Sequence, residues 1–188
     1  PSTYKDIFWL LEKSKIIDVM PGEIIVVGKN GNIDFEVFSS SYETAHCVFQ
    51  DVYFAKSTSV IDGKPVSESR RNLGRNLADL VREKIPDIEK SKEDYLVVHV
   101  PRTAKPAAKA LAEYFNLKEE DALEVVETVL RSFINAEEGI KKILEDKFVV
   151  HDEYTENKKI ILVDDSIVRG NTSRKLIKLL RERGTAKE

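Results

Sequence analysis

The amino-acid sequence predicts an α/β protein in which a parallel sheet is flanked by helices. Residues 95–100 and 159–163 are runs of mostly aliphatic and β-branched side chains, as expected of strands that are buried on both faces. Each run is followed by a loop and then by a segment whose apolar residues have helical spacing. Strand, loop and helix in this repeated order are typical of a parallel sheet covered by helices.

The helices of this part are predicted from apolar residues spaced three and four apart. Leu73, Leu77 and Leu80 show this spacing, and Pro86 ends the pattern. The segment 123–126 fits a strand or a helix equally well. The expected helices cover residues 66–84, 107–115 and 173–183.

The first part of the chain predicts a smaller antiparallel unit. Residues 23–27 and 33–38 are short apolar strands, and an Asn-Gly pair between them is a strong signal for a hairpin turn. Residues 47–55 are predicted as a further extended run. A helix is predicted near the N-terminus, where Thr3 can cap it.

The composition excludes several classes of protein. The 188 residues include 30 Lys and Arg and 33 Asp and Glu, and the net charge of −3 excludes a strongly basic nucleic-acid binder. A single Cys excludes an intramolecular disulfide and a Cys-rich zinc site within the chain. No apolar stretch approaches the roughly 20 residues that a membrane span requires. We therefore expect a cytoplasmic globular protein with neither nucleic acid nor membrane as a partner.

The segment that carries most chemical information is residues 160–173. A buried strand runs into Asp164 and Asp165, and a short loop containing Gly170 leads into a helix. A helix N-terminus presents free backbone N–H groups and the positive end of its dipole, so this junction suits a phosphate. The two carboxylates would repel a phosphate, and their natural partners are sugar hydroxyls or a divalent metal ion. A capped helix after a strand would explain an isolated Asp-Asp-Ser triplet, whereas the whole string predicts a site for a phosphorylated sugar.

Residues 163–173 resemble the motif with which type I phosphoribosyltransferases bind phosphoribosyl pyrophosphate (PRPP). More narrowly, the string Val-Asp-Asp-Ser-Ile-Val-Arg-Gly-Asn-Thr-Ser resembles the amidophosphoribosyltransferase family, the glutamine PRPP amidotransferases. Only Asn171 departs from the usual motif. Further segments resemble the family in the same order, and these are residues 47–55, 59–63 and 70–74.

The resemblance implies a division of the chain into two domains. Residues 57–188 would be a type I phosphoribosyltransferase domain, and residues 1–56 the antiparallel tail of a glutaminase-type domain. We expect the chain to be a piece of a longer or split protein, because the family continues beyond both of its ends. The partners implied are a glutaminase domain or subunit and further copies of the chain in a homo-oligomer.

The activity that the resemblance implies is transfer of ammonia, released from glutamine, to C1 of PRPP in purine synthesis. Phosphoribosylamine and pyrophosphate are the products, and Mg²⁺ would neutralise the pyrophosphate. The ribose hydroxyls and, indirectly, the metal would be held by Asp164 and Asp165, which with Arg131 form the catalytic set. The 5′-phosphate of PRPP or of a nucleoside monophosphate would be bound by Ser166, Arg169, Gly170, Asn171, Thr172 and Ser173.

Two loops depart from the family pattern. The pyrophosphate loop lacks the usual Asp and Gly, and Arg102, Thr103 and Lys105 are its expected anion ligands. In the loop over residues 125–134, Arg131 is the one basic residue that remains, and Glu127 reverses a charge. Because no Cys opens the chain, we expect no glutaminase activity from the chain alone.

Two other functions stay open. A non-catalytic PRPP-binding, nucleotide-binding or regulatory module needs only the 5′-phosphate loop, which is intact. The two altered loops therefore favour this alternative. A phosphoribosyltransferase for a nucleobase is weaker, because the sequence shows no aromatic site for stacking a base. Cys47 is predicted to be a small buried residue and not an iron–sulfur ligand. His99 is predicted to be a structural histidine that precedes the pyrophosphate loop, and the three histidines show no metal-binding spacing.

Overall fold

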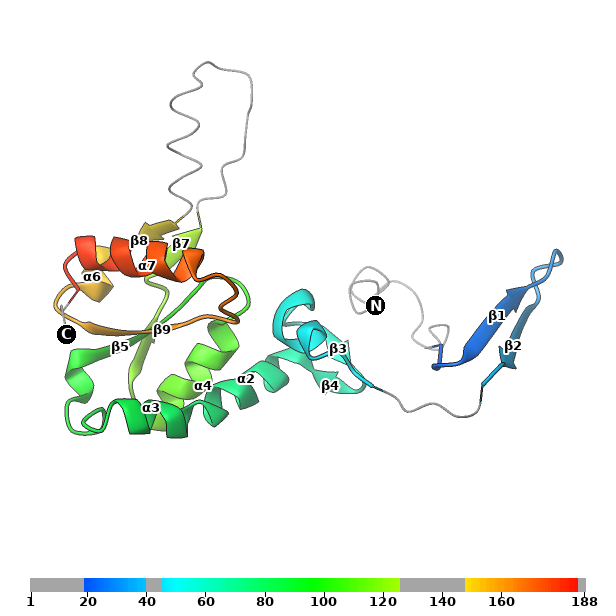
Figure 1. Ribbon diagram of the computed structural model, residues 1–188, viewed down its shortest axis with the longest axis horizontal. Coiled ribbons are helices and arrows are strands. Elements are labelled where there is room, and N and C mark those ends of the chain that lie inside the picture. The colour runs from blue at the N-terminus through cyan, green and yellow to red at the C-terminus, as the bar shows by residue number, and fades with distance from the viewer. Residues whose placement is uncertain (1–18, 40–44, 126–147, 186–188) are drawn as a thin grey trace, which may run out of the picture.

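The computed structural model describes residues 19–39, 45–125 and 148–185 of the chain (Figure 1). The predicted helix near the N-terminus lies outside these residues. The strands of the described part are β1 (Glu23–Val27), β2 (Ile33–Val37), β3 (Val60–Ile61), β4 (Lys64–Pro65), β5 (Tyr95–His99), β6 (Lys118–Glu120), β7 (Leu123–Val125), β8 (Phe148–Val150) and β9 (Lys159–Val163). Its helices are η3 (Gln50–Phe54), α2 (Val66–Asn76), α3 (Ala78–Lys84), η4 (Lys92–Asp94), α4 (Lys105–Phe115), α6 (Asp152–Thr155) and α7 (Asn171–Glu182).

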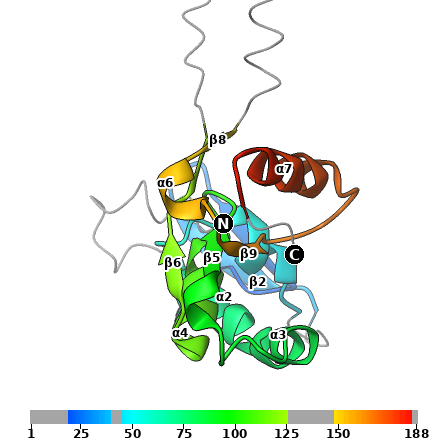
Figure 2. The same cartoon turned by 90° about the vertical axis from the view of Figure 1, so that its left-hand side faces the viewer.

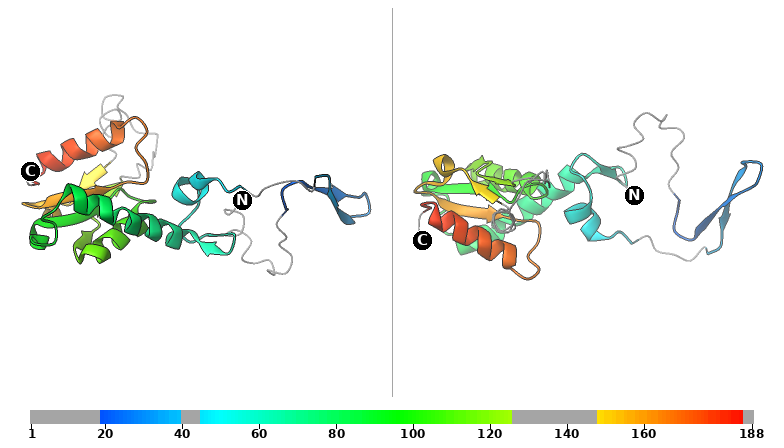
Figure 3. Two further views of the ribbon diagram at one scale, coloured as in Figure 1. Left: turned by 60° about the horizontal axis from the view of Figure 1, so that its bottom comes forward. Right: turned by 90° about the horizontal axis from the view of Figure 1, so that it is seen from above.

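A three-stranded parallel sheet in the order β6-β5-β9 forms the centre of the fold. Helices α2, α3 and α4 lie on one side of it and α7 on the other (Figures 2 and 3). Side chains that alternate along β5 build a core on each side. Val97 is buried with Phe115 of α4, whereas Val98 is buried with Leu176 of α7. The predicted α/β class with a parallel sheet flanked by helices is therefore confirmed.

The predicted helices are confirmed, with adjusted ends. The helix predicted over residues 66–84 is interrupted at Leu77, which separates α2 from α3. Its N–H still bonds the Leu73 carbonyl, and its own carbonyl accepts the N–H of Val81, so the two helices follow one another closely. The other two predicted helices begin earlier, at Lys105 and Asn171. The ambiguous segment after residue 122 forms β7, which pairs antiparallel with β8.

The predicted antiparallel hairpin near the start of the described part is also confirmed. Strands β1 and β2 pair antiparallel, with Val27 opposite Ile33. Gly31 in the turn has a φ of +83°, a left-handed conformation that glycine adopts without a steric penalty. The side chains of β2 are exposed along its whole length. No described helix is long and apolar enough to cross a membrane.

The prediction of an extended run over residues 47–55 is wrong. Residues 50–54 instead form the short π-helix η3. The Arg70 guanidinium donates to the carbonyl oxygen of Asp51 within this helix and to that of Ala55 directly after it, each at 2.8 Å. These contacts override the strand preference of the aromatic and β-branched side chains. Cys47 is exposed beside this helix, so its predicted burial is also wrong.

Close packing of α2 against α4 depends on Gly74. A Cβ atom built at this buried glycine would lie 2.1 Å from the Ala107 carbonyl oxygen and 2.8 Å from the Ala107 Cα. Both neighbours belong to the backbone of α4, so no side-chain rotation can relieve the clash. The absence of a side chain at position 74 therefore sets the distance between the two helices.

We predict that Gly74→Ala lowers the free energy of unfolding by about 1–3 kcal/mol, the usual cost of overpacking. This would occur although alanine is favoured over glycine inside a helix by about 1 kcal/mol. Urea denaturation measures the change, and Asn76→Ala at an exposed position of α2 is the matched control, expected to stay within about 0.5 kcal/mol. Equal or higher stability of Gly74→Ala would contradict the close approach.

Candidate functional site

The candidate site lies where β5 and β9 end side by side. The two strands pair in parallel with His99 opposite Val163, and the N–H of Val100 extends the pairing to the Val163 carbonyl at 2.8 Å. The loops that follow the strands are therefore neighbours. The Thr103 hydroxyl donates a hydrogen bond to Oδ2 of Asp165 at 2.5 Å, which ties the first loop to the second.

An open cleft of about 1030 Å³ covers this end of the sheet. Residues 164–173 form one of its walls, and residues 100–103 form another. Phe49, Tyr53 and Phe54 contribute an aromatic wall, which the sequence reasoning missed. In open α/β sheets ligands bind at the carboxyl ends of the strands, which is where this cleft lies.

The part of the cleft that is predicted to bind a phosphate includes Gly170. This residue has a φ of +70°, which a residue with a side chain rarely adopts, and it precedes the first turn of α7. No side chain caps this helix end, so backbone N–H groups of its first turn are available to an anion. All six residues predicted to bind the 5′-phosphate line the cleft: Ser166, Arg169, Gly170, Asn171, Thr172 and Ser173.

The two predicted catalytic carboxylates both line the cleft. Asp164 accepts the backbone N–H of Asp165 at 2.9 Å, and Asp165 accepts the Ser166 hydroxyl at 3.1 Å. Burial raises the pKa of Asp164, and the neighbouring charge of Asp165 raises it further. Together the two side chains offer oxygen donors of the kind that sugar hydroxyls and hard divalent cations require.

Arg70 holds the aromatic wall in place, and the sequence reasoning missed it as well. Its side chain is buried and donates to the Ser57 hydroxyl as well as to carbonyl oxygens in and directly after η3. Burial lowers the pKa of Arg70, and the charges of Asp165 and Asp51 oppose this shift. A signal was present in the sequence, because Val66, Arg70 and Gly74 are four residues apart and form the buried face of α2.

The structure places two of the three predicted pyrophosphate ligands in the cleft. Arg102 and Thr103 line the cleft, and Arg102 has a φ of +89°, a strained conformation for a residue with a side chain. Lys105 does not line the cleft, because its Nζ donates to both carboxylate oxygens of Asp121 at 2.5 and 2.7 Å. Arg131 lies outside the described residues.

The fold and the cleft define a class of protein. A helix start without a side-chain cap and paired carboxylates, at the carboxyl end of a parallel sheet, are typical of an α/β domain that binds a phosphorylated sugar or nucleotide. Comparison with known proteins then shows which proteins of this class the chain is similar to. No protein-family model matches the chain.

Curated relatives of the chain are amidophosphoribosyltransferases. The chain is 31% identical over 170 residues to that of Pseudomonas aeruginosa, 36% over 174 residues to that of Homo sapiens, and 34% over 171 residues to that of Pyrococcus horikoshii. These matches cover 90%, 91% and 91% of the chain but 33%, 32% and 35% of the relatives. The chain thus spans about a third of the length of the curated relatives it matches.

Solved structures agree with the sequence comparison. One, described as the allosteric regulatory enzyme of purine biosynthesis, matches with a TM-score of 0.71 and 32% identity over 91% of this chain and 35% of its own. Another is the glutamine PRPP amidotransferase from B. subtilis complexed with ADP and GMP, with a TM-score of 0.70 and 32% identity over 89% of this chain and 35% of its own. The predicted resemblance to the amidophosphoribosyltransferases is confirmed for the third of their length that the chain spans.

The raised pKa of Asp164 makes stability depend on pH. A carboxyl whose pKa is higher in the folded state opposes folding once it ionises, so its penalty grows as pH rises above the ordinary value of 3.8. We predict that Asp164→Asn increases the free energy of unfolding at pH 7 by about 0.5–2 kcal/mol, the usual range for a stabilising substitution. The advantage should vanish below the ordinary carboxyl pKa, where native Asp164 is also neutral.

Urea denaturation across the pH range measures this difference, and the exposed Asp34→Asn is the matched control. The substituted amide keeps an acceptor for the Asp165 N–H, so the comparison isolates the charge. Lower stability of Asp164→Asn than of the native chain at pH 7 would show that burial of the carboxylate does not cost folding energy.

Proposed function

We propose that the chain forms the PRPP-binding phosphoribosyltransferase part of an amidophosphoribosyltransferase. The observation that carries this proposal is that the start of α7, Asp164 and Asp165 line the same cleft. The similarity to curated amidophosphoribosyltransferases over about nine-tenths of the chain supports it. Ammonia transfer to PRPP, giving phosphoribosylamine and pyrophosphate in the cytoplasm, is the activity proposed for the whole protein.

The proposed roles follow from charge. Gly170 and the first turn of α7 bind the 5′-phosphate through backbone N–H groups, because these groups carry the positive end of the helix dipole. Asp164 and Asp165 hold the ribose hydroxyls and favour the positive charge that develops at C1 as pyrophosphate leaves. Arg102 and Thr103 face the pyrophosphate.

A divalent cation, proposed to be Mg²⁺, would neutralise the leaving pyrophosphate when bound. The oxygen donors of Asp164 and Asp165 suit such an ion, as ligands of it or of its water molecules. Ammonia is proposed to come from a glutaminase domain or subunit, and assembly into a homo-oligomer is also a proposal. Cys47, the one thiol of the chain, lies exposed beside η3 and is assigned no part in releasing ammonia.

Binding of a ribose 5-phosphate group is the direct test. We predict that PRPP and ribose 5-phosphate raise the melting temperature of the chain, and that a ligand at 100 times its Kd adds about 2.7 kcal/mol of stability. In Asp165→Asn the effect of the ribose ligands should weaken to that of inorganic phosphate, because only the ribose uses the carboxylate. Thermal shift and calorimetry measure both effects.

The exposed Asp34→Asn serves as the matched control and should respond like the native chain. If no ribose 5-phosphate ligand binds at millimolar concentration, the phosphate-binding interpretation of the α7 start is wrong. If inorganic phosphate and the ribose ligands lose affinity equally in Asp165→Asn, the Asp165 carboxylate does not bind the ribose hydroxyls.

A second candidate function is a nucleotide-binding or regulatory module without catalysis. Two observations favour it: Lys105 is engaged by Asp121 instead of facing the cleft, and the aromatic wall of Phe49, Tyr53 and Phe54 is suited to stacking against a base. Such a module would bind a nucleoside monophosphate without turning over PRPP. The two candidates therefore differ in chemistry and not in the 5′-phosphate site.

We predict slow release of pyrophosphate from PRPP with magnesium and ammonia, because the loss of one preorganised donor costs about 2.7–4 kcal/mol, a factor of roughly 100 to 1000. Val125→Lys should raise the rate, since Val125 lines the cleft and the added cation would face the leaving group. Val149→Lys on the neighbouring strand, exposed and absent from the cleft lining, is the matched control. A native rate equal to that of Val125→Lys would remove the main support for the regulatory module.

A further inference from the structure

An ion pair between Lys105 and Asp121 lies at the surface, next to the loop that lines the cleft. The Lys105 ammonium donates to both carboxylate oxygens of Asp121 at 2.5 and 2.7 Å, and neither residue lines the cleft. The hydrogen bond from Lys105 lowers the pKa of Asp121, so the carboxylate stays ionised at neutral pH. A cation of the proposed pyrophosphate loop is thus already bound by a side chain of the protein.

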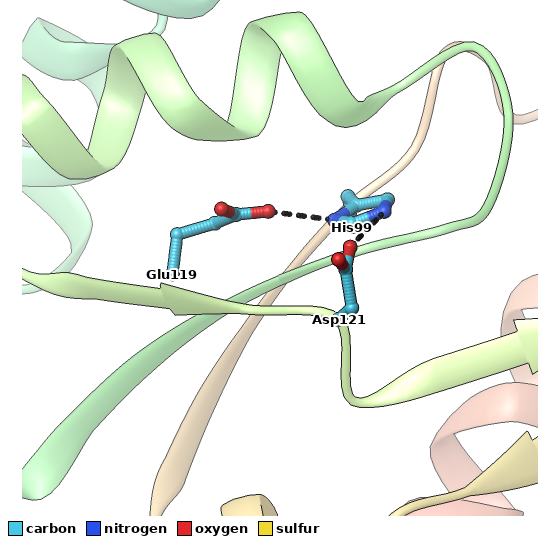
Figure 4. A group of neighbouring side chains, drawn as sticks. All are labelled: His99, Glu119 and Asp121. Carbon is cyan, nitrogen blue, oxygen red and sulfur yellow. Dashed lines mark hydrogen bonds and ion pairs between the residues drawn. The ribbon is translucent and has the colours of Figure 1, made fainter.

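The sheet and a buried histidine hold Asp121 in position. Asp121 directly follows β6, whose parallel pairing with β5 places Glu120 beside Val98. Nε2 of His99 lies 3.3 Å from Oδ1 of Asp121, while Nδ1 of the ring lies 2.8 Å from Oε1 of Glu119 (Figure 4). The His99 and Glu119 side chains are only 5% and 12% exposed, so this support is buried. Asp121 therefore meets the lysine from a position that the sheet sets.

Lys105 is close enough to the cleft to contact a ligand there once it is released. It follows Thr103 by two residues, and Cα atoms two residues apart are separated by at most about 7 Å. The Thr103 hydroxyl donates to the cleft carboxylate of Asp165, so this part of the loop borders the site. Lysine carries its ammonium on a flexible four-carbon stem. The direction of that stem is therefore decided by the anion that binds the ammonium, which in this structure is Asp121.

We propose that Asp121 is a specificity-determining residue, which lowers the affinity of the cleft for a pyrophosphate group by keeping Lys105 away from it. The proposal rests on the proposed function, since it concerns the pyrophosphate half of the same cleft. Specificity is a difference between two affinities, and withholding a favourable contact from one ligand changes that difference. A ligand whose only phosphate is the 5′-phosphate does not need Lys105, whereas PRPP gains this cation only if the pair with Asp121 breaks. Asp121 therefore shifts the preference of the cleft from PRPP toward ribose 5-phosphate and nucleoside monophosphates.

Calorimetric titration with PRPP, inorganic pyrophosphate and ribose 5-phosphate tests the proposal. We expect Asp121→Asn to lower the Kd of PRPP and of pyrophosphate by about fivefold, the factor that corresponds to the roughly 1 kcal/mol of an exposed ion pair. The Kd of ribose 5-phosphate should stay unchanged. The asparagine amide keeps the size of the carboxylate and removes its charge, and circular dichroism checks that the variant is folded.

The same substitution in a Lys105→Gln chain separates release of the lysine from the mere loss of a negative charge. If Asp121 acts through Lys105, Asp121→Asn has no effect on PRPP or pyrophosphate binding in that chain, which a double-mutant cycle measures. An equal gain in both backgrounds would show that the carboxylate only repels anions and would overturn the proposal.

Asp87→Asn is the matched control, because it breaks another exposed pair of lysine and aspartate. Asp87 lies 3.2 Å from Lys90, and neither residue lines the cleft. The Kd values of this variant should equal those of the native chain for all three ligands. A gain as large as that of Asp121→Asn would mean that any lost surface carboxylate favours anions, and the specific role of Asp121 would be wrong.

The three ligands also separate this proposal from the proposed function. Failure of ribose 5-phosphate to bind the native chain would contradict the proposed function, and inorganic pyrophosphate would still measure the release of Lys105. Unchanged or weaker affinity of Asp121→Asn for both PRPP and pyrophosphate would overturn the specificity role and leave the ribose 5-phosphate site in place.

Discussion

The pairing of β5 with β9 is the constraint on which the candidate site depends. The register that places His99 opposite Val163 also fixes where both loops leave the sheet. Because parallel strands end at the same edge, residues more than sixty positions apart in the chain become neighbours there. The bond from Thr103 to Asp165 is the visible consequence. A shift of this register by one residue would send every side chain of the strand to the opposite face and separate the two loops.

The front of the cleft depends on a different set of contacts. Gly74 lets α2 approach the backbone of α4, and Arg70, one helical turn earlier, projects from the same buried face. The guanidinium then binds the carbonyls of the η3 segment, which carries the aromatic wall. A buried charge is tolerated at this position because its donors are used by carbonyl and hydroxyl oxygens. Arg70 and the close contact of α2 with α4 thus help to hold the aromatic wall beside the sheet.

Local signals explain what the sequence could predict. Apolar runs predict the strands at residues 95–100 and 159–163, and adjacent carboxylates followed by a glycine predict the loop after the second strand. Each of these signals is contiguous in the chain. The errors depend on distant partners. Residues 47–55 have strand-like composition, but carbonyl groups of this segment are bound by Arg70, which lies 15 to 19 residues away. Lys105 looked like an anion ligand until the placement of β6 brought Asp121, 16 residues further on, within hydrogen-bonding distance.

This difference between local and distant contacts also separates binding from chemistry in the cleft. The proposed 5′-phosphate half is one continuous segment, so the proposed anion site depends little on contacts elsewhere in the chain. The proposed pyrophosphate half consists of residues 100–105, whose beginning follows β5 and whose far end is bound to Asp121 beyond β6. Within it, the hydrogen bond from Thr103 to Asp165 places the loop beside the carboxylates of the cleft. The ion pair of Lys105 with Asp121 instead holds the Lys105 ammonium away from them. The geometry therefore leaves Arg102 and Thr103, but not Lys105, beside the carboxylates of the cleft.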